Sequence, residues 1–296
     1  MLRFWKGETK EERGAPEAGP VLGGVALGAR PWLVLGGGGL KGLTHLGALK
    51  VLREAGFEPT GIIGTSIGAL VGAAVASGAD LDELIARARG LSRGDIARID
   101  RRAVWVNGIR SESFFRETPL RDYLAGALPG SWEEFEIRFQ ANSVELGSGR
   151  TEWFGIGART DVTPVEAIYA SAALPVFYPP ARLPGGVYMD GGAEYALPLH
   201  RAAELGATGI VAIDPGAHQI ASAEAVAAGG MLAIHERVFS IMSGRVRRQT
   251  VDEWEGPPLL YLRPELEGYG SFDFAHVRYF LEEGERKARA ALGMES

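Results

Sequence analysis

Apolar positions change their spacing repeatedly along the chain after residue 31, and this change predicts alternating strands and helices. Residues 32–35 are a short apolar run that ends in four glycines, and residues 40–55 then place Leu43, Leu46 and Val51 on one helical face. Short apolar runs bounded by turn residues are typical of buried strands, whereas apolar residues at every third or fourth position are typical of helices. The pattern therefore predicts a strand, a glycine loop and a helix.

The same unit follows again. Residues 61–63 are apolar, Gly64-Thr65-Ser66 interrupts them, and residues 67–77 are apolar or small on every side, which is typical of a fully buried helix. Further strands are predicted at 136–143, 152–156, 208–213 and 259–262, and further helices at 79–88, 164–172, 222–248 and 274–292. Strands alternating with helices predict an α/β fold, a three-layer sandwich with a central, mostly parallel sheet.

The first 28 residues depart from this pattern. They are rich in Gly, Pro and Glu and show no apolar period, so we expect residues 1–28 to form a loose N-terminal arm and residues 29–296 to form a single domain. The N-terminus turns charged at once, and the longest weakly polar stretches are shorter than the roughly 20 residues that span a bilayer. We therefore expect neither a signal peptide nor a membrane span, and we expect the protein to be cytoplasmic.

Composition and charge remove several classes of function. Of 296 residues, Lys+Arg number 31 and Asp+Glu 37, and the net charge of −6 argues against a nucleic-acid partner. The chain has no Cys, which excludes disulfides, thiolate metal sites and a thiol nucleophile. It also lacks an H-E-x-x-H motif and an EF-hand loop, so we expect no metal and no other cofactor.

The sequence Gly37-Gly38-Gly39-Leu40-Lys41-Gly42 matches G-x-G-x-x-G between a predicted strand and a predicted helix. A dinucleotide-binding fold would place an acid at the end of the next strand, where this chain has Gly-Thr-Ser, and a P-loop would have Ser or Thr after Gly-Lys. Successive glycine amides beside a helix N-terminus favour the binding of an anion, so we interpret this loop as an anion site. The alternative is a glycine-rich turn that only permits close packing. For Lys41 we favour a surface ion pair over contact with an anionic head group.

The sequence Gly64-Thr65-Ser66-Ile67-Gly68 matches G-x-S-x-G, again between a strand and a helix. Such a turn presents a serine hydroxyl in a cleft. An ordinary α/β-hydrolase would add a histidine, but none of the five histidines lies in a glycine-rich setting at a strand end, with His218 as the nearest to one. For His45 we favour a packing or hydrogen-bonding role, and the base need not be a histidine.

Met189-Asp190-Gly191-Gly192 follows Gly185-Gly186-Val187-Tyr188, so we expect Asp190 to lie where a short strand ends in a turn. By itself, Asp-Gly-Gly is an ordinary turn sequence. Together with the two glycine motifs and with residues 170–180, however, it resembles the patatin-like phospholipase family, over residues 32–292, and in particular its bacterial cytoplasmic branch. The resemblance implies that Ser66 is the nucleophile and Asp190 its base, without histidine, and that the glycine loop is the oxyanion hole. The residues that then serve as oxyanion donors are Gly37, Gly38, Gly39 and Ile67, and the supporting motif glycines are Gly42, Gly64, Gly68, Gly191 and Gly192.

The resemblance implies a serine lipid acyl hydrolase of the phospholipase A, lysophospholipase or esterase type, acting on a phospholipid or another fatty acyl ester. An acyltransferase, a non-catalytic lipid-binding or regulatory module and a nucleotide-binding oxidoreductase are the alternatives. We expect an acyl-binding wall at residues 105–115 and 174–178. The basic stretch 243–248 either meets lipid phosphates in a transient membrane contact or, as we favour, is a solvated helix face. Residues 193–198 differ from the polar segment that many relatives carry at this place, so the identity of the substrate stays open. The sequence does not indicate the oligomeric state.

Overall fold

The computed structural model describes residues 19–100, 111–216 and 222–294. Its centre is an eight-stranded sheet with the order β10-β9-β3-β4-β5-β8-β7, in which β6 also pairs with β5. Five strands run parallel: β3 (Pro31–Leu35), β4 (Gly61–Gly64), β5 (Arg138–Glu145), β9 (Gly209–Ile213) and β10 (Leu259–Leu262). The antiparallel strands are β6 (Thr151–Gly155), β7 (Ala181–Leu183) and β8 (Gly186–Asp190). The mostly parallel sheet predicted from the sequence is confirmed.

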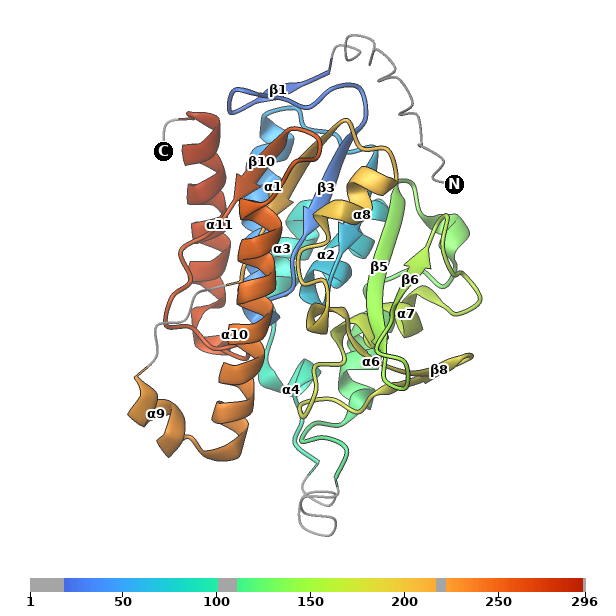
Figure 1. The fold of residues 1–296 in the computed structure, drawn as a ribbon, viewed down its shortest axis with the longest axis vertical. Helices are drawn as coiled ribbons and strands as arrows, with labels where there is room; N and C mark the ends of the chain where they lie inside the picture. Colours follow the sequence, from blue (N-terminus) through green and yellow to red (C-terminus); the bar gives the residue numbers. More distant parts are fainter. Residues whose placement is uncertain (1–18, 101–110, 217–221, 295–296) are drawn as a thin grey trace, which may run out of the picture.

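Helices cover both faces of this sheet, because its central strands are apolar on both sides (Figure 1). Leu33 and Leu35 point into a large core, whereas Trp32 and Val34 point into a smaller core on the opposite face. The large core contains α1 (Thr44–Glu54), α2 (Ile67–Ala76), α3 (Leu81–Gly90), α6 (Glu117–Ala125), α7 (Pro164–Ala172) and α11 (Val277–Leu292). The smaller core is covered by α8 (Leu199–Glu204) and the end of α10 (Gly230–Asp252). The predicted three-layer sandwich is therefore present, with unequal helical layers.

Among the differences from the predicted boundaries, two change the organisation of the chain. Strands β1 (Val21–Leu22) and β2 (Val25–Ala26) form a hairpin, and the following Leu27 is fully buried. The predicted arm 1–28 therefore extends too far, because residues 19–28 contain this folded hairpin; residues 1–18 lie outside the described residues. The helix predicted at 222–248 is divided into α9 (Ala223–Ala228) and α10 at Gly230, whose φ of +72° lies in the left-handed region that favours glycine.

Strand β5 brings two distant segments end to end. Strand β4 ends with Gly64 paired to Ala141, and β8 ends with Asp190 paired to Ser143, only two residues further along β5. Both lie on the same edge of β5, because β6 occupies the other edge over this length. The carboxyl ends of β4 and β8 therefore face one another. Within the described residues, no helix combines the length and the apolar character needed to cross a bilayer.

Candidate active site

Ser66 occupies a sharp turn between β4 and α2. Its φ of 57° and ψ of −123° are rarely adopted by residues other than glycine, and such strain is typical of functional sites. A side chain at Gly64 would collide with the carbonyl of Gly68, and one at Gly68 would collide with the carbonyl of Leu35. The two motif glycines therefore let α2 start directly against β3 and β4, which makes the turn this tight.

The carboxylate of Asp190 meets the hydroxyl of Ser66. Ser66 Oγ donates to Asp190 Oδ2 at 2.7 Å, and the amide of Gly192 donates to Oδ1 at 2.7 Å. Burial raises the pKa of Asp190 to about 6, although both hydrogen bonds and the positive charge of Arg247 act in the opposite direction. A carboxylate of this pKa can receive a proton from a hydroxyl at close range near neutral pH.

Three further polar side chains, those of Thr65, Asn142 and Ser171, hold this arrangement, and no role was predicted for them from the sequence. The backbone N–H of Ser66 donates to Ser171 Oγ at 3.0 Å. Asn142 of β5 accepts from Thr65 Oγ1 at 2.7 Å and donates to the carbonyl of Gly191 at 3.1 Å. Asn142 thus links the serine turn to the aspartate turn. The sequence does not single out Asn142, because the predicted strand 136–143 also contains Glu136, Arg138, Gln140 and Ser143.

The glycine loop differs from the prediction at one position. The amide of Gly37 donates to the carbonyl of Ala196 at 3.0 Å, so it is already used by the fold and is not available to a ligand. The amides of Gly38, Gly39 and Ile67 have no acceptor in the part of the chain that the structure describes, and all three residues line the pocket beside Ser66. Gly38 and Gly39 also lie too close to Pro215 and Ser271 to carry side chains.

Arg247 of α10 is buried, which corrects the prediction of a solvated helix face at 243–248. Its Nη2 donates to the carbonyl of Gly37 at 2.7 Å, and its Nε lies 3.5 Å from Asp214 Oδ1. Tyr261 donates to the other oxygen of Asp214 at 2.9 Å. Arg247 therefore holds the glycine loop although it lies far away in the sequence. Of the three arginines in this stretch, Arg245 and Arg248 face solvent.

Lys41 is also buried and lines the pocket, so the expected surface ion pair is wrong. No described residue accepts a hydrogen bond from its ammonium group, and burial, with the nearby charge of Arg247, lowers the pKa of Lys41 to about 8. His45 is fully buried with Nε2 2.9 Å from the carbonyl of Gly36, and burial lowers its pKa to about 4. This agrees with the expected hydrogen-bonding role. His218 lies outside the described residues.

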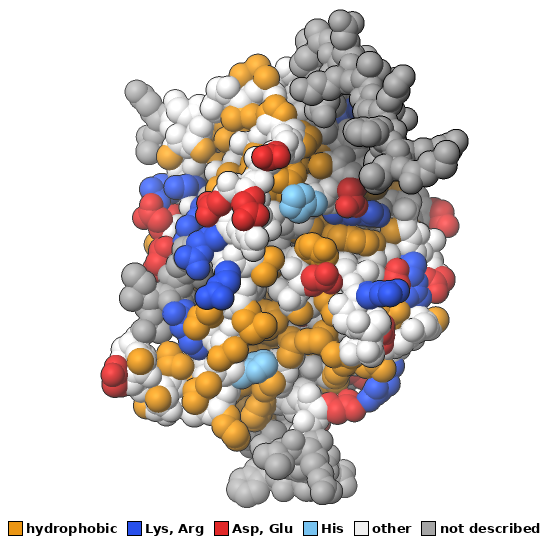
Figure 2. All heavy atoms as spheres, in the orientation of Figure 1, with side chains coloured by type: hydrophobic (Ala, Val, Ile, Leu, Met, Phe, Trp, Pro, Cys, Tyr) orange, Lys and Arg blue, Asp and Glu red, His pale blue; other side chains and the backbone are white. Residues whose placement is uncertain are grey.

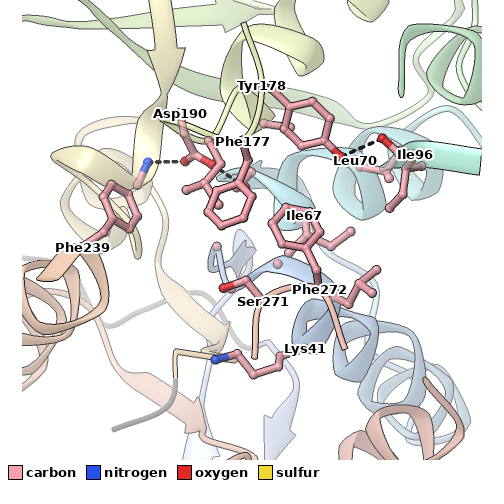
Figure 3. A pocket seen from close by; sticks show the side chains of 18 of the residues that line it. Lys41, Ile67, Leu70, Ile96, Phe177, Tyr178, Asp190, Phe239, Ser271 and Phe272 are labelled. Carbon is pink, nitrogen blue, oxygen red and sulfur yellow. Dashed lines mark hydrogen bonds between the residues drawn. The ribbon is translucent and has the colours of Figure 1, made fainter. Parts of the chain in front are cut away.

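The pocket beyond Ser66 is predominantly apolar (Figure 3). Of the expected wall at 174–178, the side chains of Leu174, Phe177 and Tyr178 line it, and Tyr178 is fixed by donating to the carbonyl of Ile96 at 2.9 Å. Of the other expected wall, residues 105–110 lie outside the described residues, and Phe115 packs against Phe177 with ring centroids 5.7 Å apart. Further apolar lining comes from α2, α4 (Arg93–Ile96) and α6, through Ile67, Leu70, Ile96, Leu120 and Leu124.

Residues 33–203 match the family model described as patatin-like phospholipase, and this stretch contains the serine turn, the glycine loop and Asp190. The chain belongs to the patatin-like phospholipase family. The match ends before α10, so Arg247 and the other pocket residues of that helix lie in a part of this patatin-like chain that the family model does not cover.

Curated relatives extend the match at moderate identity. An uncharacterised NTE family protein of Mycobacterium tuberculosis is 34% identical over 187 residues, which cover 62% of this chain and 48% of that protein. A protein named lysophospholipase NTE1 from Coccidioides immitis is 30% identical over 262 residues, covering 82% of this chain and 16% of that protein. The chain thus spans at most about half the length of these relatives. Among solved structures, VipD of Legionella pneumophila shares the fold, with a TM-score of 0.54 at 16% identity over 96% of this chain and 72% of that chain.

Proposed function

We propose that this patatin-like chain is a serine lipid acyl hydrolase in which Ser66 is the nucleophile and Asp190 is its base. The observation that carries the proposal is the 2.7 Å hydrogen bond from Ser66 Oγ to Asp190 Oδ2 at the floor of an apolar pocket. In the described part of the chain, this hydroxyl donates to the carboxylate and to no histidine ring.

Asp190 activates the serine. A serine hydroxyl is a weak nucleophile until a base takes its proton, and an aspartate of ordinary pKa is a poor base near neutrality. Because burial raises the pKa of Asp190 to about 6, the carboxylate is a better proton acceptor and is still mostly ionised at neutral pH. As Ser66 Oγ attacks the ester carbonyl carbon, its proton moves to Asp190, and from there to the alcohol oxygen when the ester C–O bond breaks.

The negative charge on the carbonyl oxygen requires hydrogen-bond donors. The amides of Gly38, Gly39 and Ile67 are the candidates, because each lines the pocket beside Ser66 without an acceptor among the described residues. The amide of Ile67 also begins α2, where the helix dipole favours negative charge. A single donor of this kind typically contributes about 3 kcal/mol to transition-state stabilisation. Water, deprotonated by Asp190, then attacks the carbonyl carbon of the acyl-enzyme, and the proton passes from Asp190 to Ser66 Oγ as the bond to the acyl group breaks and the fatty acid leaves.

The lining favours an acyl chain. From Ser66 the apolar surface continues past Leu70 to a second small cavity that includes Leu46, Ala74 and Leu84, and the two cavities share Leu70. This surface contains few polar groups, so it suits a flexible hydrocarbon chain rather than a polar ligand. Lys41, whose ammonium group has no hydrogen-bond acceptor among the described residues, supplies a cation for an anionic part of the substrate. Since relatives carry the name lysophospholipase, a single-chain phospholipid is the first natural substrate to test.

A fluorophosphonate probe tests the nucleophile. We expect the wild type to be labelled at Ser66 and to hydrolyse p-nitrophenyl butyrate and lysophosphatidylcholine, whereas Ser66→Ala should lose labelling and at least about 10³-fold of the rate. The control is Ser77→Ala, which removes a serine hydroxyl at the other end of α2. Wild-type rates in the Ser66→Ala protein would disprove the assignment.

The same assay separates the alternatives. Acyl transfer to added lysolipid or alcohol in preference to water would identify an acyltransferase that uses the same acyl-enzyme. An intact chain that the probe does not label would indicate a non-catalytic lipid-binding module. A thermal shift on adding NAD would instead favour a nucleotide-binding protein.

A further inference from the structure

Helix α10 exposes an apolar face that no other described segment covers. Six of its apolar side chains are between 40% and 78% exposed: Met231, Ile234, Val238, Ile241, Met242 and Val246. Their spacing of three, four or one residues places them along one side of the helix. They are six of the ten large hydrophobic side chains that are exposed among the described residues. An apolar surface concentrated in this way is typical of a contact with another molecule or with a membrane.

The opposite side of α10 forms part of the pocket. His235, Glu236, Phe239, Ser240, Ser243 and Arg247 line it. A more open hollow adjoins the pocket, shares Phe177, Glu236 and Phe272 with it, and reaches Leu232 of α10 and Ile99, which is itself 50% exposed. The exposed apolar face therefore lies beside the entrance to the pocket. Figure 2 shows hydrophobic side chains gathered over the lower part of the molecule, where Figure 1 places α9 and the start of α10.

The charges on α10 indicate what covers this face. Between Met231 and Val251 the helix carries four arginines and one acid, although the whole chain has a net charge of −6. The acid, Glu236, is turned inward and accepts from the amide of Ser271 at 2.9 Å. Arg245 and Arg248 are exposed next to the apolar residues. Apolar side chains flanked by cations are complementary to an anionic phospholipid surface, whereas a second copy of the same face would bring like charges together.

We propose that the outer face of α10 docks on the surface of phospholipid aggregates and thereby holds the pocket entrance against the lipid layer. The apolar residues from Met231 to Met242 would enter the head-group region, and Arg245 and Arg248 would contact lipid phosphates. The role assigned to docking, delivery of a lipid acyl ester to Ser66, rests on the proposed function, whereas the docking itself does not require it.

Flotation with lipid vesicles tests the proposal on the full chain. The vesicles contain phosphatidylcholine with or without about one third phosphatidylglycerol. The test variant combines Met231→Gln, Ile234→Gln and Val238→Gln, because glutamine removes the apolar contact and keeps good helix propensity. The matched control combines Val21→Gln and Leu146→Gln, which are 64% and 47% exposed on other elements. A second variant combines Arg245→Gln and Arg248→Gln.

We expect the wild type and the control to float with the vesicles, and the α10 triple variant to bind at least about tenfold more weakly. The arginine variant should lose the preference for phosphatidylglycerol. Hydrolysis of soluble p-nitrophenyl butyrate should be unchanged in the triple variant, and hydrolysis of vesicle lipid should fall with binding. If the wild type does not hydrolyse p-nitrophenyl butyrate, the result contradicts the proposed function but not the docking proposal, because flotation does not require turnover.

Three results would overturn the docking proposal: no flotation of the wild type, equal flotation of the triple variant, or an equal loss in the control. A dimer in sedimentation that the triple variant converts to monomer, with vesicle binding unchanged, would assign the face to a second copy instead.

Discussion

The pocket is bordered by two neighbouring strand-to-helix turns, one after β3 and one after β4, that share a glycine-rich sequence but are held in place differently. The conformation of the turn after β4 is set mainly from within, because Gly64 and Gly68 let α2 approach and Ser66 itself takes the strained conformation. Hydrogen bonds with Asn142 and Ser171 then hold this turn in place. The turn after β3 is fixed from outside, by bonds of Gly37 to Ala196 and Arg247 and of Leu40 to Ser271. A short motif therefore encodes most of the turn after β4, whereas the turn after β3 depends mainly on residues distant in the chain.

This difference has a chemical counterpart. The turn after β4 presents a side chain whose position must be set relative to one carboxylate, so the local conformation and the hydrogen bonds of Asn142 and Ser171 are sufficient. The turn after β3 presents backbone amides, whose directions depend on the whole loop, so several partners are needed. We therefore expect substitutions at Ser66 and Asp190 to abolish activity and substitutions around the glycine loop to reduce it by degrees.

The largest expected effect comes from Asp190→Asn, which keeps the shape of the side chain and removes the base. Hydrolysis of p-nitrophenyl butyrate should fall by about 10³-fold. The same variant should be more stable at pH 7.5, because a rise in pKa from 3.8 to about 6, at about 1.4 kcal/mol per unit, means that ionised Asp190 costs the fold about 3 kcal/mol. This cost is absent below pH 4, so the gain in Tm over wild type should disappear there. Wild-type activity in this variant would remove Asp190 from the mechanism.

Gly38→Ala tests the glycine loop. A Cβ at this position would lie 2.9 Å from Pro215 Cγ, so the loop must shift and its amides lose their alignment. We expect kcat on a soluble ester to fall by about 10²-fold with a smaller change in KM. Gly90→Ala is the matched control, because nothing lies within 4 Å of its added Cβ, and it should retain full activity. An equal loss in both variants would contradict a specific role of the loop.

The pH profile of the wild type gives the next effect. Since Asp190 must be ionised to act as a base, and its pKa is about 6, kcat/KM should be near its plateau at pH 7 and about tenfold lower at pH 5. The measurement uses a neutral soluble ester, so that charges on the substrate do not enter. An acid limb near pH 4 would mean that the buried carboxylate is not the titrating base.

Arg247→Met should reduce kcat by roughly tenfold, because the carbonyl of Gly37 loses its donor while the free amides remain. Its positive charge also lowers the pKa of Asp190, so the acid limb of the pH profile should move upward. A lower Tm is expected as well, since Asp214 stays buried without its cation. Arg248→Met, on the exposed side of the same helix, should change none of these quantities. A lower rate without a shifted acid limb would limit Arg247 to a structural role.

The smallest expected effect is none at all: dialysis against excess EDTA should leave the rate unchanged. The proposed steps use a hydroxyl, a carboxylate and backbone amides, none of which requires a metal. Loss of activity that calcium restores would contradict the mechanism proposed for both turns.

The sequence predicted the parts of this molecule that are encoded locally. Both glycine-rich turns, their flanking strands and helices, and the mostly parallel sheet followed from short patterns, since strand and helix periods and glycine positions are properties of neighbouring residues. The break between α9 and α10 was missed because Gly229 and Gly230 are also compatible with a continuous helix of lower stability.

The rest depended on contacts across the fold. Arg247 was predicted to be exposed because its neighbours are charged, and its burial follows from the partners Asp214 and Gly37, which are far away in the sequence. Lys41 was assigned to the surface because lysine is rarely buried, and the pocket wall that covers it comes from later segments. The free and the occupied amides of the glycine loop were indistinguishable in the sequence, since the acceptor for Gly37 is the carbonyl of Ala196.

Strand β5 sets the separation of the two proposed catalytic residues, because their strands end against it only two residues apart, at Ala141 and Ser143. One inserted residue between these positions would lengthen the strand by about 3.4 Å and turn Asn142 toward the opposite face of the sheet. A lengthened hairpin turn between β7 and β8 would leave the spacing unchanged. Engineering of this fold should therefore tolerate insertions in that hairpin and fail on a single one in the middle of β5.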